Sequence, residues 1–488
     1  MLDMARVTER FEHYMQMAQA IPAWGYNTIF AHATDNEGCA IIFDSHPELA
    51  GPHALTKAQV RQWIAAAKDA GASIIPEIEC FGHTQFIHNH PKYKHLAMPT
   101  TGHFNAINPL HPDTHTILND LLTDTAELFD SPYIHAGFDE VNLGDRSVLG
   151  EPAAGKEDWE IFADMVNLVH GMIEKLGKRM MIWGDHLVSE PRIASRISKD
   201  IIVCDWQYHA DLSTRTTDAL LELGFEVMCC PASARSGDMF MPRANTLGNL
   251  QRFARIAHSR GGRVLGLSNT VWCPGRLLCG TELFAYALGG AWFNNPEADA
   301  AEVMSNFVTE RYGIGEQADE LAEALLDLST LIPHNSLPRR IMQTETSHKA
   351  PPSPITFAEA RTMEQIARQV AELRPALEAY QGRATQNPHE FANYLLVCDL
   401  IAWLNRLAGF RVEGEPSASR SQIVDEGSKL LDRCCGDWSR RRFDDDPYRD
   451  NDPYPEEDGL ITNLQRSLAE LQQSQGAAAP DREVGALG

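Results

Sequence analysis

The 488-residue chain lacks long hydrophobic runs. No stretch approaches the roughly 18 apolar residues that a membrane-spanning helix requires, and the first residues, MLDMARVTERF, do not have the basic and apolar segments of a secretory signal. Positive charge is also scarce, with 42 Lys and Arg against 67 Asp and Glu and a net charge of −25. Such a surface repels phosphate backbones and anionic headgroups, so we expect neither nucleic acid nor a membrane as the partner. The lack of signal and membrane-spanning patterns leads us to expect a cytoplasmic protein.

Metal-ligand patterns are weak as well. The ten cysteines include the adjacent pairs Cys229-Cys230 and Cys434-Cys435 but form no CxxC pair, and we expect reduced, structural thiols. The segments HNHPKYKH and LHPDTH contain His and Asp without Cys or Glu at ligand spacing. The sequence therefore predicts no metal and no other cofactor.

Eight short apolar segments recur through the first 270 residues, with helical patterns between them. One such helix is expected over residues 57–72, where Val60, Trp63, Ile64 and Ala67 share a face. Strands that alternate with helices form parallel βαβ units, and eight of them predict an α/β fold of the (β/α)8 TIM-barrel class. The segments begin at Met1, Thr28, Ser73, Tyr133, Arg179, Ile201, Glu226 and Arg263.

Helical periodicity replaces the strand pattern after about Asn295. Apolar stripes predict a C-terminal α-helical domain; they comprise Leu321, Leu325 and Leu328, and then Met363, Ile366, Val370, Leu373 and Leu377. We expect a catalytic barrel over 1–310, whose first strand is truncated at Met1, a helical domain over 311–475 and a disordered tail over 476–488. The Pro- and Asp-rich stretch 438–459 is expected to be an exposed loop. A homodimer through the helical domain remains an open alternative.

Polar residues follow the ends of several predicted strands, where barrel enzymes place their catalytic groups. Two neighbouring acids, Asp139 and Glu140, follow the fourth strand in YIHAGFDEV. Their mutual repulsion favours one proton donor beside one charged carboxylate. Trp183, Trp206 and Trp272 end three other strands, and aromatic walls of this kind bind the apolar faces of sugar rings.

Five motifs carry a specific resemblance. LDMARV, HATDNEG, IPEIECFGHT, YIHAGFDEV and MIWGDH have the order and spacing found in the catalytic domain of glycoside hydrolase family 20. The resemblance spans residues 1 to about 295 and leaves out the helical domain. It implies an exo-acting β-N-acetylhexosaminidase that removes a terminal β-linked amino sugar without an enzyme nucleophile.

The resemblance also implies roles for individual residues. Glu140 would be the general acid and base, and Asp139 would orient the substrate's acetamido group. Asp35 and His83 would form a relay that tunes the proton affinity of Glu140. The resemblance implies substrate contacts for Arg6, which would hold hydroxyls, and for Trp183, Trp206 and Trp272, which would wall the pocket. We expect His135 to be structural, whereas Glu77 would either orient its neighbours or touch the ligand.

Several positions depart from the family pattern. A usual Tyr after the seventh strand, which donates to the acetamido oxygen, is absent; Ser236 stands in its place and Tyr208 is a candidate substitute. Asp238 is expected to keep a hydroxyl-binding role. Trp272 is followed by Cys273 and Pro274 rather than by the usual Glu two residues on. Phe81 replaces a usual Pro and Phe138 a usual Gly.

These departures leave three functions open. The leading one is hydrolysis of terminal β-linked N-acetylglucosamine or N-acetylgalactosamine by a retaining, substrate-assisted mechanism. A second keeps the mechanism but changes the substrate to a modified amino sugar or a disaccharide unit. The third is a non-catalytic sugar-binding protein on a decayed hydrolase scaffold.

Overall fold

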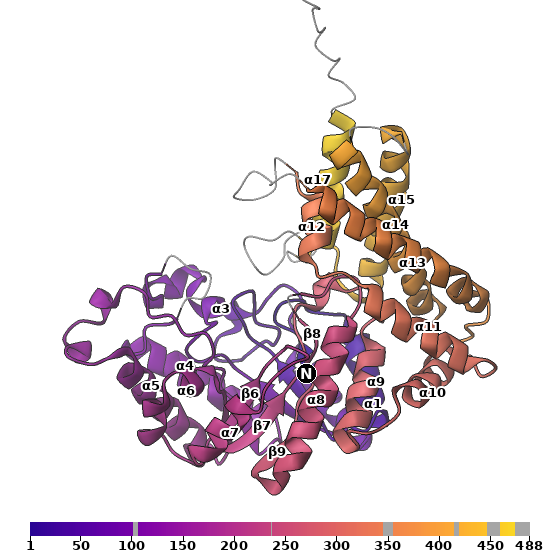
Figure 1. Ribbon diagram of the computed structural model, residues 1–488. Helices are drawn as coiled ribbons and strands as arrows, with labels where there is room; N and C mark the ends of the chain where they lie inside the picture. Colours follow the sequence, from indigo (N-terminus) through magenta and orange to yellow (C-terminus); the bar gives the residue numbers. More distant parts are fainter. Residues whose placement is uncertain (101–105, 236, 345–354, 414–418, 447–458, 474–488) are drawn as a thin grey trace, which may run out of the picture.

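A curled sheet of eight parallel strands forms the centre of the computed structural model, which describes residues 1–100, 106–235, 237–344, 355–413, 419–446 and 459–473 (Figure 1). The strands are hydrogen-bonded in the order β1-β2-β3-β4-β5-β6-β7-β9. Each begins within one residue of its predicted start, which confirms the barrel class. Their bounds are β1 (Leu2–Asp3), β2 (Thr28–His32), β3 (Ser73–Glu77), β4 (Tyr133–His135), β5 (Arg179–Trp183), β6 (Ile202–Trp206), β7 (Glu226–Cys230) and β9 (Val264–Leu267).

The inward-facing side chains of these strands meet in one apolar cluster, which shows how strongly the sheet curls. Phe30 of β2, Ile75 of β3, Met181 of β5 and Ile202 of β6 are all buried in it. Partly buried Trp206 and Trp272 pack against the same cluster. An apolar interior of this kind is typical of a TIM barrel, in which chemistry is confined to the ends of the strands.

Helices lie between the strands along the chain. The predicted helix at 57–72 is α2, whose N-terminus is fixed by a capping box between Thr56 and Gln59. Val60, Trp63 and Ala67 of α2 are buried, as the pattern predicts. The helices of the barrel are α1 (Phe11–Ala23), α2 (Lys57–Asp69), α3 (Gln85–His88), α4 (Pro112–Leu128), α5 (Asp158–Lys175), α6 (Asp185–Ser189), α7 (Arg215–Glu222), α8 (Ala244–Arg260) and α9 (Leu283–Asn294).

A short second sheet extends the chain beyond two of the barrel strands. In it β8 (Ala232–Ala234), which follows β7, pairs in parallel with β10 (Thr270–Val271), which follows β9. The amide of Trp272 donates to the carbonyl oxygen of Ala234 over 3.0 Å. This pairing was not predicted, and it brings Arg235 and Trp272 to the same edge.

The C-terminal helices rise to one side of the barrel (Figure 1). Leu321, Leu325 and Leu328 are buried along one of them, which confirms the predicted stripe. No helix in the described ranges has both the length and the apolar character to cross a membrane. The helices are α10 (Ala300–Tyr312), α11 (Ala318–Leu331), α12 (Ser336–Met342), α13 (Phe357–Gln381), α14 (Pro388–Glu413), α15 (Arg420–Arg441) and α17 (Leu460–Gln473).

The division of the chain into domains stays a prediction. The proposed boundary at residue 310 falls within α10, which contacts both α9 and α11. One apolar core cluster includes side chains of the barrel and of the C-terminal helices alike. The predicted tail, 476–488, lies outside the described residues.

The end of α15 fastens the helical region to the barrel. Arg441 and Arg442 are both ion-paired with Glu9, at 2.7 and 3.2 Å. Arg442 also donates to the carbonyl oxygens of Pro274, over 2.8 Å, and Leu277, over 3.2 Å. The prediction of an exposed loop over 438–459 is therefore wrong for its first residues, because these cations are buried against barrel carboxylates and carbonyls; 447–458 lie outside the described residues.

Candidate active site

Asp139 and Glu140 follow β4 on a backbone that few sequences can adopt. Gly137 has a φ of +74°, and a Cβ there would lie 1.8 Å from Oε2 of Glu79. A Cβ at Gly82 would lie 2.2 Å from the carbonyl oxygen of Asp139. Both glycines are thus required by close approach. Glu140 itself has a φ of +48°, a strained value for a residue with a side chain.

The two aromatic departures from the family pattern contact each other. The rings of Phe81 and Phe138 lie 5.9 Å apart, edge to face, and both pack against Phe162 of α5. Phe138 has a φ of +77°, in the left-handed region that the usual Gly adopts without steric strain. Apolar packing beneath the acid pair offsets this strain, since all three rings are buried.

A chain of ion pairs connects the acid pair to buried charges, as the predicted relay requires. Nε2 of His83 lies 3.3 Å from Oε2 of Glu140 and 3.6 Å from Oδ2 of Asp139. Its Nδ1 lies 2.9 Å from Oδ1 of Asp35. Burial opposes the imidazolium, but the Asp139 and Asp35 carboxylates outweigh it and raise the pKa of His83 well above its usual range. The ring therefore places a cation beside both acids.

Arg6 completes the charge balance around Asp35. Its Nη2 lies 2.6 Å from Oδ2 of Asp35 and its Nη1 lies 3.1 Å from Oδ2 of Asp3. Burial alone would raise the pKa of Asp35, yet Arg6 and His83 hold that pKa well below its usual range. The guanidinium also lies over the ring of Trp272, 5.1 Å from its centroid. Arg6 thus joins the relay to the wall of the pocket.

Glu77 orients its neighbours from beneath the pocket. Its carboxylate bonds to Nδ1 of His32, lies 3.1 Å from Nδ1 of His135 and accepts the indole N–H of Trp183 over 2.8 Å. Burial would raise the pKa of Glu77, but His32 and His135 lower it to about 2. His32 reaches Asp35 over 2.7 Å, so the network continues upward to the relay.

Asp139 is hard to ionise. Burial raises its pKa to about 7; His83 opposes the rise, and the carboxylates of Asp185 and Glu140 add to it. Asp185, the first residue of α6, is near because its Oδ2 accepts the amide of Glu140 over 3.1 Å. Near neutral pH the Asp139 carboxyl is therefore poised between its two protonation states.

A cavity of about 70 Å³ opens directly above the acid pair. The rings of Trp206 and Tyr208 stack 5.2 Å apart, and the indole N–H of Trp272 donates to the Tyr208 hydroxyl over 2.8 Å. The lining residues are Arg6, His83, Asp139, Glu140, Trp206, Tyr208, Arg235 and Trp272. Seven of the ten residues that the sequence analysis assigned to the site therefore share one cavity.

The other three expected site residues lie behind this lining. Asp35 is buried under Arg6 and His83. Trp183 is 1% exposed and packs 5.8 Å from the Trp272 ring. Asp238 is 1% exposed, with its carboxylate taken by Arg243 at 2.8 Å. Substrate contact by Trp183 and Asp238 stays a prediction.

Two further residues contact the site but were not predicted from the sequence. Arg235 lines the cavity and directly follows β8. It was not predicted because β8 is too short, and its side chains are too small, to give a strand pattern in the sequence. Asp185 belongs to the motif MIWGDH, but its contact with Glu140 joins two different strand ends. The position of Asp185 two residues after β5 was the available signal.

A larger cavity, of about 410 Å³, lies at the opposite end of the barrel. It is bordered by the starts of strands, including Thr28 and Tyr133, and no Asp, Glu or His side chain lines it. Of these two cavities, only the smaller one, at the carboxyl ends of the strands, is lined by Asp, Glu and His side chains, and barrel enzymes place their catalytic groups at that end.

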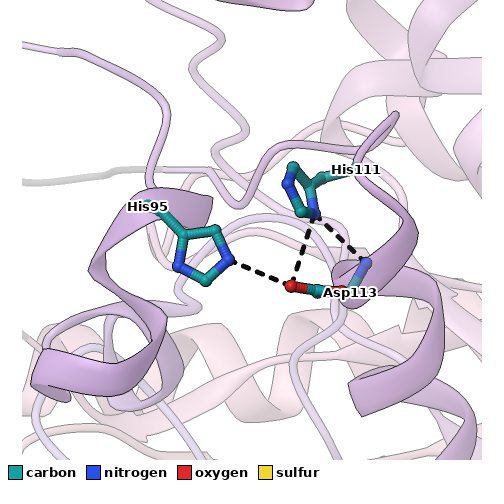
Figure 2. Close-up of side chains that lie close together, drawn as sticks. All are labelled: His95, His111 and Asp113. Atoms are coloured by element: carbon teal, nitrogen blue, oxygen red, sulfur yellow. Dashed lines mark hydrogen bonds and ion pairs between the residues drawn. The ribbon is translucent and has the colours of Figure 1, made fainter.

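Three groups of side chains have metal-ligand types within 4.8 Å of one another, and two of them belong to the network above. The third is His95, His111 and Asp113, shown in Figure 2. Nδ1 of His111 accepts the amide of Asp113 as the N-cap of α4, and Nε2 of His95 lies 3.1 Å from Oδ2 of Asp113. These contacts are those of an exposed helix start, and we assign no metal to them.

The comparisons with known proteins agree with this geometry. Residues 1–245 match the family described as glycosyl hydrolase family 20, catalytic domain. A beta-hexosaminidase of Vibrio furnissii is 25% identical over 267 residues, which cover 47% of this chain and 42% of that protein. A beta-N-acetylhexosaminidase of Cellulomonas fimi is 25% identical over 240 residues, covering 46% and 44%. The chain thus spans less than half the length of these curated relatives.

Solved structures share the fold. A family 20 exo beta-N-acetylglucosaminidase of Vibrio harveyi superposes with a TM-score of 0.52 at 22% identity, covering 66% of this chain and 57% of its own. A chitobiase of Flavobacterium johnsoniae gives 0.53 at 15% identity over 96% of this chain and 77% of its own. The family match covers half of the chain and includes every motif around the acid pair. This protein therefore belongs to glycosyl hydrolase family 20.

Proposed function

We propose that this protein is an exo-acting β-N-acetylhexosaminidase, which hydrolyses terminal β-linked N-acetylglucosamine or N-acetylgalactosamine with retention of configuration. The observation that carries the proposal is the placement of Asp139 and Glu140 side by side at the floor of a cavity walled by Trp206, Tyr208 and Trp272. Aromatic walls suit a pyranose ring, and the floor supplies both a proton donor and a hydrogen-bond acceptor.

In the first step, Glu140 donates a proton to the glycosidic oxygen while the substrate's acetamido oxygen attacks the anomeric carbon. The bond to the leaving group breaks, and an oxazolinium forms. In the second step, Glu140 takes a proton from water, which attacks the same carbon and reopens the ring. The side chain of Glu140 suits this role because it is 38% exposed, and His83 lies 3.3 Å from its Oε2.

Asp139 would accept the acetamido N–H and offset the positive charge of the oxazolinium. One of its carboxylate oxygens, Oδ1, is buried with no hydrogen-bond partner among the described residues. A buried acceptor of this kind is costly to leave unpaired, and a substrate N–H would satisfy it. Asp139 thus acts as a carboxylate in the reaction, although its surroundings favour the acid form.

Tyr208 is our candidate for the missing family Tyr. Its hydroxyl oxygen accepts from Trp272, which leaves the O–H free to donate into the cavity. Burial raises the pKa of Tyr208 well above its usual range, so the hydroxyl keeps its proton. We propose that it donates to the acetamido oxygen and aligns that oxygen for attack.

Release of nitrophenol from aryl N-acetyl-β-glucosaminides and N-acetyl-β-galactosaminides tests the proposal. Glu140→Gln and Asp139→Asn should each lower kcat/KM by at least about a hundredfold, since general acid catalysis and electrostatic stabilisation each contribute on this scale. Glu127→Gln, on the exposed face of α4, is the matched control. Equal rates in all four proteins would refute the assignment. Absence of turnover together with tight sugar binding would instead favour a sugar-binding protein on a decayed scaffold.

A further inference from the structure

Arg235 differs from the other arginine of the cavity in its partners. Arg6 is neutralised by three carboxylates, because Asp3, Asp35 and Glu37 lie 3.1, 2.6 and 3.5 Å from its nitrogens. The guanidinium of Arg235 makes no hydrogen bond and no ion pair with any described residue, and its Nε is buried without a partner.

The acid nearest in sequence to Arg235 is already engaged. Asp238 accepts the Nε of Arg243 over 2.8 Å, the hydroxyl of Thr246 over 3.1 Å and the backbone amide of Arg235 over 2.9 Å. These bonds shape the turn after β8 but leave the Arg235 side chain directed elsewhere. The guanidinium of Arg235 therefore has the Asp238 carboxylate nearby but forms no ion pair with it.

Further basic groups surround the same turn. A Cβ at Gly237 would lie 2.8 Å from Nη2 of Arg243 and 2.8 Å from Nε2 of His334. Burial lowers the pKa of Arg235, Asp238 opposes this shift and Arg243 adds to it. Burial and the nearby arginines lower the pKa of His334, so its ring adds no charge. Arg235 and Arg243 against the single carboxylate of Asp238 still leave this wall locally cationic in a protein whose net charge is −25.

A neutral sugar would leave this half-buried cation uncompensated, whereas an oxyanion would compensate it. The guanidinium presents a planar fork of N–H donors that matches sulfate, phosphate and carboxylate oxygens. We propose that Arg235 binds an anionic substituent of the substrate, so that the protein prefers an amino sugar that carries a sulfate ester or a comparable oxyanion. This inference rests on the proposed hexosaminidase function and specifies its substrate class.

The test compares substrates that differ only in one charged substituent. Nitrophenyl N-acetyl-β-glucosaminide is assayed beside its 3-, 4- and 6-sulfated and 6-phosphorylated forms, with wild type, Arg235→Gln and Arg235→Lys. We expect wild type to cleave at least one anionic form with a higher kcat/KM than the neutral form. The ratio of the anionic to the neutral kcat/KM should fall by about tenfold or more in Arg235→Gln. Arg235→Lys should keep part of the preference, since it retains charge but not the fork. Arg368→Gln, on the exposed face of α13, controls for the change in net charge.

The outcomes separate this inference from the function on which it rests. Turnover of the neutral glycoside with no anionic preference, or an equal loss on both substrates in Arg235→Gln, would overturn the role of Arg235 and leave the hydrolase intact. If no glycoside is cleaved, calorimetric titration with N-acetylglucosamine and its 6-sulfate decides: tighter binding of the sulfate by wild type but not by Arg235→Gln supports the site. Equal affinities would refute it.

Discussion

Replacing Asp139 by Asn should stabilise the protein, and the gain should grow with pH. Burial and the neighbouring carboxylates raise the Asp139 pKa from 3.8 to about 7 in the folded protein. Between these values the folded state holds a proton that the unfolded state has released, so stability falls as pH rises. One pKa unit corresponds to about 1.4 kcal/mol. The ionised Asp139 carboxylate therefore lowers the free energy of unfolding by at most about 4 kcal/mol above pH 7, and by close to zero below pH 4. The neutral amide of the Asp139→Asn variant carries no such penalty.

Guanidinium denaturation of wild type and Asp139→Asn at about pH 4.5 and about pH 8 measures this difference. The variant should unfold at higher denaturant at both values, with a clearly larger advantage at the higher pH. Asp69→Asn, at the exposed end of α2, controls for the loss of one negative charge. A gain in stability that is independent of pH, or a variant less stable than wild type at pH 8, would refute the view that the site disfavours the ionised form of Asp139.

Three further variants probe the surroundings of the acid pair. His83→Gln removes the cation that opposes the rise of the Asp139 pKa, so the acid limb of kcat/KM should move to higher pH; an unmoved limb would contradict the relay. Tyr208→Phe leaves the indole N–H of Trp272 unpaired and should raise KM by about tenfold, from about 1.5 kcal/mol for one lost hydrogen bond; an unchanged KM would exclude Tyr208 from the substrate site. Arg442→Met breaks the bond to the Pro274 carbonyl, and should lower Tm and raise KM at temperatures where the variant is fully folded; a lower Tm with unchanged KM would limit α15 to a structural role.

The barrel and most of the cavity were predictable because their signals are local. Apolar segments such as those at Thr28 and Ser73 fix where strands begin, and the carboxyl ends of parallel strands meet at one edge. Side chains at or within a few residues of those ends, including Asp139, Glu140 and Trp206, are brought together by the topology.

The remaining features depend on contacts between distant segments. Phe81 and Phe138 each depart from the family pattern, and only the fold shows that one ring packs on the other. The Cys273-Pro274 turn, where the family has a Glu, is likewise explained by its partners: the Cys273 amide donates to Asp3, and the Pro274 carbonyl accepts from Arg442. The composition of 438–459 predicted an exposed loop, whereas the burial of Arg441 and Arg442 and their ion pairs with Glu9 are tertiary properties.

The central claim is that the substrate's own acetamido oxygen, held by Asp139, attacks the anomeric carbon. Aryl glucosaminides whose N-acetyl group carries zero, one, two or three fluorines test it most directly, because fluorine withdraws electrons from that oxygen without changing the leaving group. The account predicts that kcat/KM falls steeply, by orders of magnitude across the series. A rate that is insensitive to fluorination would contradict it and point to a nucleophile supplied by the protein.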